Sequence, residues 1–254
     1  MKFINDFTVI SNRQVQKDHT ILELQLQGTL PVMTPGQFVE VLVDKSKTTF
    51  LRRPFSIHDV NKERNTISLL IKTVGAGSAK ISEAKPGELV NMIYPLGKGY
   101  NLTEKKKVLL IGGGCGIAPL LFLSRCLKER NNDTHILLGG RSKNDVLETE
   151  AFINFGSLYI STEDGSSCEK GMVTTNTIMN EKFDKIYACG PDPMLKAVAK
   201  IAKQKNTECE VSLENTMACG IGACLCCVVD TQHGNQCVCT EGPVFNINEL
   251  KWQI

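Results

Sequence analysis

The residues best suited to chemistry in this sequence are cysteines near its C-terminal end. Six of the 11 cysteines fall in "CGIGACLCCVVDTQHGNQCVC", residues 219–239. Thiolates are soft ligands that suit iron–sulfur clusters and zinc, and in a reducing compartment clustered thiols indicate metal or redox chemistry rather than disulfides. The odd number of cysteines agrees with this interpretation. The stretch therefore predicts a metal centre.

The spacing within this stretch favours an iron–sulfur cluster over zinc. Four cysteines form the pattern C-x4-C-x2-C-x11-C, and its first two intervals are those of plant-type [2Fe–2S] proteins. Small residues between the first two let backbone N–H groups approach bridging sulfides, whereas a zinc knuckle needs only two chelating hooks. Structural zinc and thiols buried for packing are the weaker alternatives. The four predicted ligands are Cys219, Cys224, Cys227 and Cys239.

Two further cysteines leave the ligand set open. Cys226 adjoins Cys227, and adjacent residues point in different directions. Cys237 precedes Cys239 by two residues, so both would face one side of a strand. A ligand set that includes Cys237 is therefore an alternative.

Three segments of different character would position these groups. Residues 1–102 contain short, regularly spaced runs rich in Val, Ile and Leu, which predict a small antiparallel β barrel. Residues 103–207 alternate strand-like and helical runs, a pattern typical of a doubly wound parallel sheet. Residues 208–254 have too little apolar material for a core of their own, so a metal centre would supply the missing stabilisation. The predicted fold class is a β barrel plus α/β, with a small C-terminal cluster domain.

Two glycine-bearing turns in the second segment are candidates for nucleotide binding. The first, "VLLIGGGCGIAP", departs from G-x-G-x-x-G because Ile117 takes the place of the third glycine, yet its glycines and the following helix N-terminus suit a pyrophosphate. The second, "ACGPDPM", also follows a predicted strand, and such loops at the carboxyl ends of parallel strands form the ligand-binding edge of an open α/β sheet. A plain strand-to-helix turn without a ligand is the alternative. The candidate residues are Gly112, Gly113, Gly114, Gly116, Cys189, Gly190 and Pro191.

The first segment carries "FLRRPFSIHD" at the expected end of a barrel strand. Arg53 could pair with a phosphate, since its planar guanidinium binds two oxygens, and Ser56 offers a hydroxyl. Solvated arginines at a strand end are the alternative. Downstream, "LLIKTVGAGSAKIS" predicts a strand, a glycine turn and a short helix that Ser78 could cap, or else an ordinary turn.

The composition disfavours several classes of protein. The chain has 254 residues, 42% of them hydrophobic, and a formal net charge of +2, so no charge excess points to nucleic acid or an anionic membrane. The longest uncharged run, residues 108–124, holds four glycines and a proline and is shorter than the ~20 apolar residues of a spanning helix. Asn5 and Asp6 stand where a signal peptide would be apolar. We expect a cytoplasmic protein.

Together and in this order, "RRPFS", "VGAGS", "GGGCGIAP" and "CGPDPM" resemble the ferredoxin–NADP reductase superfamily. The tail, with "LENTMACGIGACLCCVV" and "CVCTEGPVF", is similar to the iron–sulfur tail of the electron-transfer subunits of dihydroorotate dehydrogenase B. The resemblance covers essentially the whole chain. It implies an FAD site, an NAD site and a [2Fe–2S] cluster on the four cysteines named above, Cys239 being the one that precedes the Gly-Pro-Val-Phe ending. The implied FAD-binding residues are Arg53, Pro54, Phe55, Ser56, Leu70, Ile71, Lys72, Gly77 and Ser78.

Some positions depart from the pattern of that family. Phe55 stands where the wider superfamily commonly has tyrosine, which puts one hydroxyl contact with the flavin or its ribityl chain in doubt. Cys226 replaces the glycine usual in "CLGC", so this loop carries an additional thiol. Arg141 and Lys143 would suit a ribose phosphate, although the resemblance implies NAD rather than NADP.

The resemblance also implies a role as an oxidoreductase subunit in pyrimidine biosynthesis. A partner subunit carrying FMN would oxidise dihydroorotate, and electrons would pass singly through the cluster to FAD and as a pair to NAD+. The assembly would be a heterotetramer with two subunits of each kind. No acid–base catalyst is expected in this chain, and Ser56 is the best candidate for touching the reactive edge of the flavin. The alternatives are a related subunit serving a hydrogenase, a sulfide dehydrogenase or ferredoxin, and a zinc-stabilised nucleotide-binding module.

Overall fold

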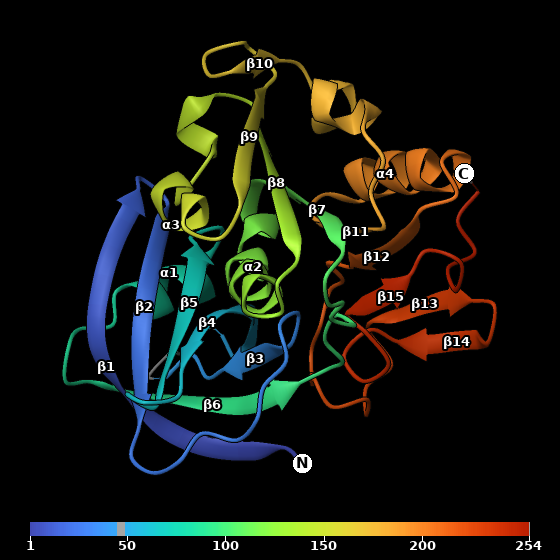
Figure 1. Cartoon of the computed structure of the whole chain (residues 1–254). Helices are drawn as coiled ribbons and strands as arrows, with labels where there is room; N and C mark the ends of the chain where they lie inside the picture. The colour runs from blue at the N-terminus through green and yellow to red at the C-terminus, as the bar shows by residue number, and fades with distance from the viewer. Residues whose placement is uncertain (45–48, 254) are drawn as a thin grey trace.

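The computed structural model describes residues 1–44 and 49–253; Ile254, the last residue of the predicted C-terminal domain, lies outside them. The first part of the chain forms a closed antiparallel barrel, as predicted, with strand order β1-β2-β5-β4-β3-β6 (Figure 1). Alternate side chains point inward, so that Phe7, Leu22 and Ile57 are fully buried. The elements are β1 (Phe3–Gln16), β2 (His19–Leu26), β3 (Phe38–Val41), β4 (Arg53–Asn61), β5 (Thr66–Lys72), α1 (Ala76–Ser82) and β6 (Leu89–Leu96).

The second part is a sheet of order β10-β9-β8-β7-β11-β12-β15, in which neighbours are parallel except for the last pair. The order reverses between β7 and β11, which makes the sheet doubly wound, as predicted. The strands are β7 (Lys107–Gly113), β8 (Asp133–Gly140), β9 (Ser157–Thr162), β10 (Glu169–Lys170), β11 (Lys185–Cys189), β12 (Glu208–Ser212) and β15 (Val244–Asn246). The helices are α2 (Leu120–Glu129), α3 (Thr149–Ile153) and α4 (Asp192–Gln204), with short 3-10 turns at Gly114–Ile117, Lys143–Asp145, Val173–Thr175 and Thr177–Asn180. In the described part of the chain, no helix is long and apolar enough to cross a membrane.

The cysteine-rich tail is built onto this sheet. Strands β12 and β15 belong to the sheet itself, and only the hairpin of β13 (Val228–Thr231) and β14 (Gly234–Cys237) stands apart (Figure 1). Val238 and Phe245 pack in one core with Leu109 and Ile186 of the sheet, which agrees with the expectation that the tail lacks a core of its own. The limits 1–102, 103–207 and 208–254 stay a prediction about domains.

Helix α2 lies against strand β4 and joins the barrel to the nucleotide-binding sheet. The Arg125 guanidinium of α2 contacts the Asp59 carboxylate of β4 over 2.6 Å. Beside it, Nδ1 of His58 lies 2.8 Å from the carbonyl oxygen of Ala118 at the start of the helix. These polar contacts fix the edge of the sheet that carries the glycine turn relative to the strand that carries the "RRPFS" motif.

Candidate functional site

The structure brings the four predicted cluster ligands together as two pairs. The thiols of Cys219 and Cys224 are hydrogen-bonded to each other, and so are those of Cys227 and Cys239. The Cys239 N–H also donates to Sγ of Cys227 over 3.4 Å. Cys219 interacts electrostatically with Cys239, so both pairs belong to one group of thiols. Two pairs suit a [2Fe–2S] cluster, because each of its irons takes two thiolates.

The backbone around Cys219 favours a thiolate. Burial opposes ionisation, but the N–H groups of Ile221, Cys224 and Ala223, together with the Cys224 thiol, lower the pKa of Cys219 to about 6. The Ile221 N–H donates to Sγ of Cys219 over 3.5 Å. Because the thiolate is the form that binds metal, this loop presents one ligand ready for iron, and the same N–H groups would stabilise a negative cluster.

The glycines of the cysteine loop are needed for its path. Gly220 has a φ of +66°, and a Cβ there would lie 2.5 Å from Cγ of Glu40. Gly222 has a φ of +86°, and a Cβ there would lie 2.9 Å from Cγ2 of Thr240. Both dihedrals are strained for any other residue. The loop thus wraps closely against barrel strand β3 and against the turn that follows the last predicted ligand, and these surroundings fit a bound cluster.

The two other cysteines of the tail differ in their surroundings. Cys226 is exposed, and its thiol donates to the carbonyl oxygen of Thr216 over 3.6 Å. Cys237 is buried, but β14 ends there, so the sequence argument that Cys237 and Cys239 share one face of a strand is wrong. Cys237 still interacts with the Cys227 thiol, and a ligand set that includes it stays an alternative. Within residues 1–44 and 49–253, no three His, Cys, Asp or Glu side chains are arranged to hold a single metal ion.

The predicted FAD motif lies at the start of strand β4, so the expectation that it lies at the end of a strand is wrong. Arg53 packs on the glycine turn at the start of α1, where a Cβ on Gly77, the second residue of the helix, would lie 2.7 Å from Nε of Arg53. The guanidinium donates to the carbonyl oxygens of Leu51 and Arg52, at 2.9 and 3.1 Å. A fixed guanidinium beside a bare backbone is a surface that fits a phosphate or pyrophosphate.

Ser78 fixes this glycine turn from inside. It is the third residue of α1, and Gly75, not Ser78, is the residue at the N-cap. Its hydroxyl oxygen accepts the N–H groups of Val74 and Gly75, at 2.9 and 3.2 Å. The Ser78 hydroxyl therefore stabilises the conformation of the turn by binding two backbone N–H groups of the turn.

The remaining predicted FAD residues divide by exposure. Leu70 and Ile71 are buried in the core, so only their backbone could contact a cofactor. Lys72 is exposed at the end of β5. Three half-buried residues at the start of β4 complete the set: Pro54, Phe55 and Ser56.

The two predicted nucleotide loops meet where the order of the sheet reverses. Gly112 on β7 and Cys189 on β11 are in register. A Cβ on Gly116 would lie 2.2 Å from the carbonyl oxygen of Cys189, so the loops touch through their backbones. Burial raises the pKa of Cys189 well above its usual range, and its thiol is hydrogen-bonded to the Ser212 side chain and to the backbone of Gly190. The other residues of the two loops are Gly113, Gly114, Gly190 and Pro191.

The predicted FAD and NAD sites adjoin at this edge. Nε2 of His19, on β2, lies 3.5 Å from Sγ of Cys115 in the first glycine loop, and Nδ1 of His19 lies 2.7 Å from Oδ1 of Asp18. Burial raises the pKa of Cys115 to about 11, although the nearby Lys72 lowers it. The sequence gives no signal for His19, because a single histidine in a strand-like run shows no ligand spacing. The contact places the end of the predicted flavin site beside the nucleotide loops.

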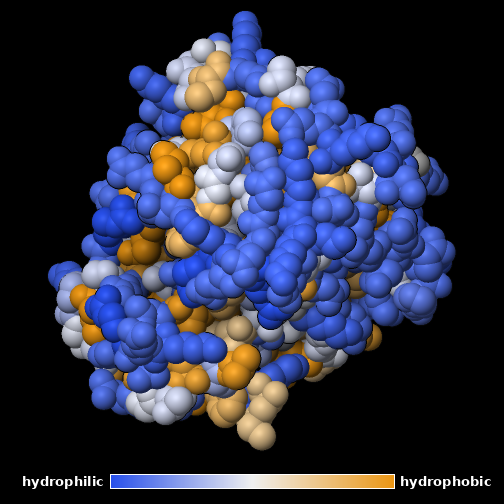
Figure 2. Space-filling model, viewed as in Figure 1, coloured by the Kyte–Doolittle hydropathy of each residue, from blue (hydrophilic) through white to orange (hydrophobic). Residues whose placement is uncertain are grey.

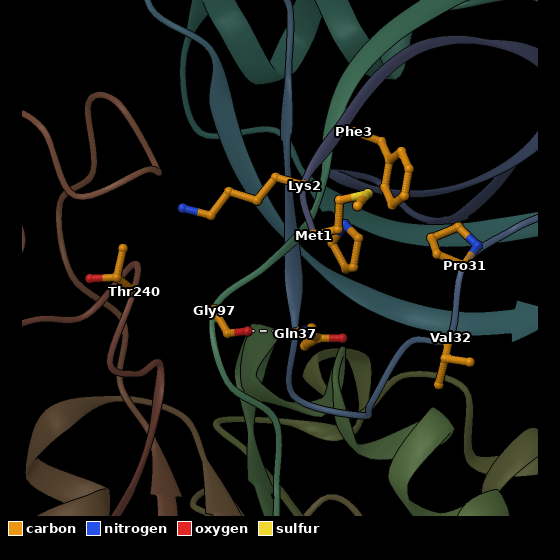
Figure 3. Close-up of a pocket in the computed structure, with 9 residues that line it drawn as sticks. Met1, Lys2, Phe3, Pro31, Val32, Gln37, Gly97 and Thr240 are labelled. Carbon is orange, nitrogen blue, oxygen red and sulfur yellow. Dashed lines mark hydrogen bonds between the residues drawn. The ribbon is translucent and has the colours of Figure 1, made fainter.

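One pocket lies outside the predicted sites (Figure 3). It has a volume of about 340 Å³ and opens between the start of β1, a barrel loop and the turn after the cysteines. Figure 2 shows a mostly hydrophilic face with separate apolar areas, one of them at the lower edge, where Figure 1 places the N-terminus. The lining residues are Met1, Lys2, Phe3, Pro31, Val32, Gln37, Pro95, Gly97 and Thr240.

Three family models match successive parts of the chain. They are described as "Oxidoreductase FAD-binding domain", residues 6–100, "Oxidoreductase NAD-binding domain", residues 110–200, and "Iron-sulfur cluster binding domain of dihydroorotate dehydrogenase B", residues 214–251. These matches confirm the three predicted cofactors, while the individual binding residues stay predictions.

Similar proteins agree with these matches. The chain is 37% identical to the electron transfer subunit of dihydroorotate dehydrogenase B (NAD(+)) of Fusobacterium nucleatum, over 98% of both chains. It is 39% identical to the protein of the same name of Caldanaerobacter subterraneus, over 95% of this chain and 96% of the other. The solved structure of the NADH-dependent reduced ferredoxin-NADP oxidoreductase is also similar, with a TM-score of 0.86 and 27% identity over 97% of this chain and 90% of the other. A cytochrome P450 reductase from Amycolatopsis, at a TM-score of 0.68 and 22% identity over 81% of this chain and 67% of the other, shares the fold.

The fold and the matches define a class of protein, an oxidoreductase that combines FAD-binding, NAD-binding and iron–sulfur domains in one chain. Within that class, the chain belongs to the family of electron-transfer subunits of dihydroorotate dehydrogenase B.

Proposed function

We propose that this chain is the electron-transfer subunit of an NAD-linked dihydroorotate dehydrogenase in pyrimidine biosynthesis. Its partner is a catalytic subunit that carries FMN and oxidises dihydroorotate, and the assembly is a heterotetramer with two copies of each subunit. The names of relatives that are 37% and 39% identical over nearly the full chain support this proposal.

The observation that carries the proposal is the contiguity of the three candidate sites. The loop that begins at Cys219 packs on β3, and β3 pairs with β4, which carries Arg53. The other end of the barrel site, at Lys72, adjoins Cys115 in the first nucleotide loop. When bound, FAD supplies transfer of one or two electrons and a [2Fe–2S] cluster supplies transfer of one. The chain provides the positions and the electrostatics for a path from one-electron to two-electron chemistry.

The residues have distinct proposed roles. Four thiolates hold the cluster, and loop N–H groups stabilise its negative charge. Arg53 and the turn at Gly77 would hold the FAD phosphates, and Ser56 would offer its hydroxyl to the reactive edge of the flavin. The glycine loops at the switch point of the sheet bind NAD through backbone N–H groups. The proposed cluster ligands are Cys219, Cys224, Cys227 and Cys239.

The proposal is tested first by the composition of the protein purified without air. We expect two irons, two acid-labile sulfides and one FAD per chain, together with the visible absorption bands of both groups. Mixed with the FMN-bearing subunit, the protein should reduce NAD+ when dihydroorotate is added. Zinc without flavin would instead indicate a zinc-stabilised nucleotide-binding module.

A related flavin subunit for another redox partner is the second candidate. The likeness to the NADH-dependent reduced ferredoxin-NADP oxidoreductase favours it. Copurification discriminates between the two, because a dihydroorotate-oxidising flavoprotein would support the first proposal and a ferredoxin-linked subunit the second. Arg141 and Lys143 are exposed after β8, so oxidation of NADH and NADPH should be compared in the same assay. We expect a preference for NADH.

A further inference from the structure

Glu40 is a buried acid that the proposed function leaves without a role. It lies in β3 with 0% of its surface exposed. Neither carboxyl oxygen has a hydrogen-bond partner among the residues that the structure describes. A buried polar group without a partner costs free energy, so such a group in a folded protein needs an explanation, and a redox or catalytic role is one of the common ones.

The neighbours of Glu40 belong to both candidate cofactor sites. On the cluster side, an added Cβ on Gly220 would lie 2.5 Å from Cγ of Glu40 and 2.9 Å from its Oε1, so the carboxyl group lies directly against the cysteine loop. On the flavin side, Glu40 is in register with Pro54 of the "RRPFS" motif. Arg52 donates to the backbone carbonyl oxygen of Glu40 over 3.2 Å. Its guanidinium also donates to Oδ1 of Asn91.

We propose that Glu40 is a positioning residue for the iron–sulfur cluster: its buried carboxyl group lies between the FAD-binding strands and the loop from Cys219 to Cys224, and would hydrogen-bond to that loop when the cluster is bound. The inference rests on the proposed cluster ligands. Hydrogen bonds around a cluster set its reduction potential, and the outer groups that orient the ligands are part of that set. A carboxyl group anchored in a barrel strand would fix the loop backbone, and with it the N–H groups that point at sulfur.

The surroundings of the carboxyl group agree with this role. The carboxyl group interacts electrostatically with the Arg52 guanidinium on the barrel side and with the Cys219 thiol on the side of the cysteine loop. Space filling alone would not explain an acid at this position, because an apolar side chain of the same size would fill the contact without the cost of burying a carboxyl group.

Two substitutions separate hydrogen bonding from space filling. Glu40→Leu keeps a side chain of similar size against Gly220 but removes the polar atoms, and Glu40→Gln keeps hydrogen-bonding atoms in the same shape. The matched control is Glu23→Leu on β2, a strand of the same barrel that is not adjacent to β3. The measurement is a redox titration of the cluster in the holoprotein, followed by electron paramagnetic resonance, with iron, sulfide and FAD quantified on each sample.

We expect Glu40→Leu to shift the equilibrium between oxidised and reduced cluster by about tenfold, which is 59 mV for a one-electron couple, and to change the resonance line shape. Glu40→Gln should restore most of the wild-type values, and Glu23→Leu should match the wild type.

A Glu40→Leu protein that retains its cluster at the wild-type potential and line shape would overturn the inference. If Glu40→Leu loses the cluster, retention in Glu40→Gln supports the inference, and loss from both with FAD still bound overturns it. A wild-type protein without iron and sulfide would sink the proposed function as well, so the two failures are distinguishable.

Discussion

At the scale of single residues, the predicted ligand Cys239 and the additional thiol of Cys226 differ in their surroundings. Cys239 is buried beside Cys227, whereas Cys226 is exposed and donates to a backbone carbonyl oxygen. We therefore expect Cys226→Ser to keep the cluster and Cys239→Ser to lose or weaken it. The measurement is visible absorption with iron and sulfide content, and FAD content serves as the control for folding. Loss of the cluster in the first variant and retention in the second would reverse the ligand set.

Two glycines with a positive φ allow the contact between Glu40 and the cysteine loop to be tested by a change in the loop. Gly220→Ala adds both the strain of a positive φ and a Cβ only 2.5 Å from Cγ of Glu40. Gly234→Ala adds the strain alone, about 1–2 kcal/mol, because no atom lies within 4 Å of its Cβ. We expect Gly220→Ala to release iron faster to a chelator than Gly234→Ala does. Equal rates of iron release would show that the close packing of the loop does not matter for the cluster.

The sequence offers candidate cluster ligands but gives no sign of Glu40, for a physical reason. Thiol spacing is local information, and the loop from Cys219 to Cys224 carries it within a few residues. In "GQFVEVLVD", Glu40 stands among apolar residues where an alternating strand would place a solvent-facing side chain. In the structure it is fully buried, and one of the segments that pack on it is Gly220, 180 residues later in the chain. Such a contact has no local signature.

At the scale of elements, the two nucleotide loops meet through bare backbone. Gly116→Ala would place a Cβ 2.2 Å from the carbonyl oxygen of Cys189, and backbone cannot move aside as a flexible side chain can. We expect this variant to raise the KM for NADH while FAD content stays at the wild-type level. Steady-state NADH oxidation with a dye acceptor measures the effect, and Gly87→Ala, at a positive-φ glycine in the barrel with open space around its Cβ, is the control. An unchanged KM would indicate that the loops can separate without affecting NADH.

Elements with a strong apolar pattern could be predicted from the sequence, and elements whose partners are distant could not. The runs that became β7, β8, β11, α2 and α4 are buried stretches or amphipathic helices, and their pattern shows in their own residues. Strand β1 is mostly polar along "FINDFTVISNRQVQ", and it forms because β2 and β6 pair with it on both sides. Likewise β15 is three residues long and exists by pairing with β12.

At the scale of the whole molecule, His58 makes the junction of barrel and sheet sensitive to pH. Burial lowers the pKa of His58 below 6.5, against the opposing effects of the Ala118 carbonyl oxygen and of Glu148 and Asp59. The unfolded chain therefore takes up a proton near pH 6.5 that the folded chain does not. Stability is lost as the pH falls below that value, by at most about 1.4 kcal/mol for each pH unit.

We expect the free energy of unfolding to fall more steeply between pH 7 and pH 5 in the wild type than in His58→Gln. Urea unfolding at several pH values measures the difference. Glu40, whose raised pKa acts in the opposite direction over this range, contributes equally to both proteins and cancels. His233→Gln, at an exposed histidine, should keep the wild-type slope. A slope unaffected by His58→Gln would place the acid sensitivity elsewhere in the chain.

The whole molecule also separates the two ends of the proposed electron path. The nucleotide loops lie at the carboxyl edge of the parallel sheet, and the cysteine loop lies against barrel strand β3, with the FAD motif on the neighbouring strand β4. A defect confined to the cysteine loop should therefore abolish electron transfer from the partner subunit but leave electron transfer between NADH and the flavin intact. We expect Cys239→Ser to retain NADH oxidation with a dye that accepts electrons from flavin, and to lose dihydroorotate-dependent NAD+ reduction in the complex, down to the background without this subunit. Cys226→Ser should retain both activities. A parallel loss of both in Cys239→Ser, with FAD still bound, would mean that electrons from NADH reach the dye only by way of the cluster, and that the order of the path differs from the one proposed.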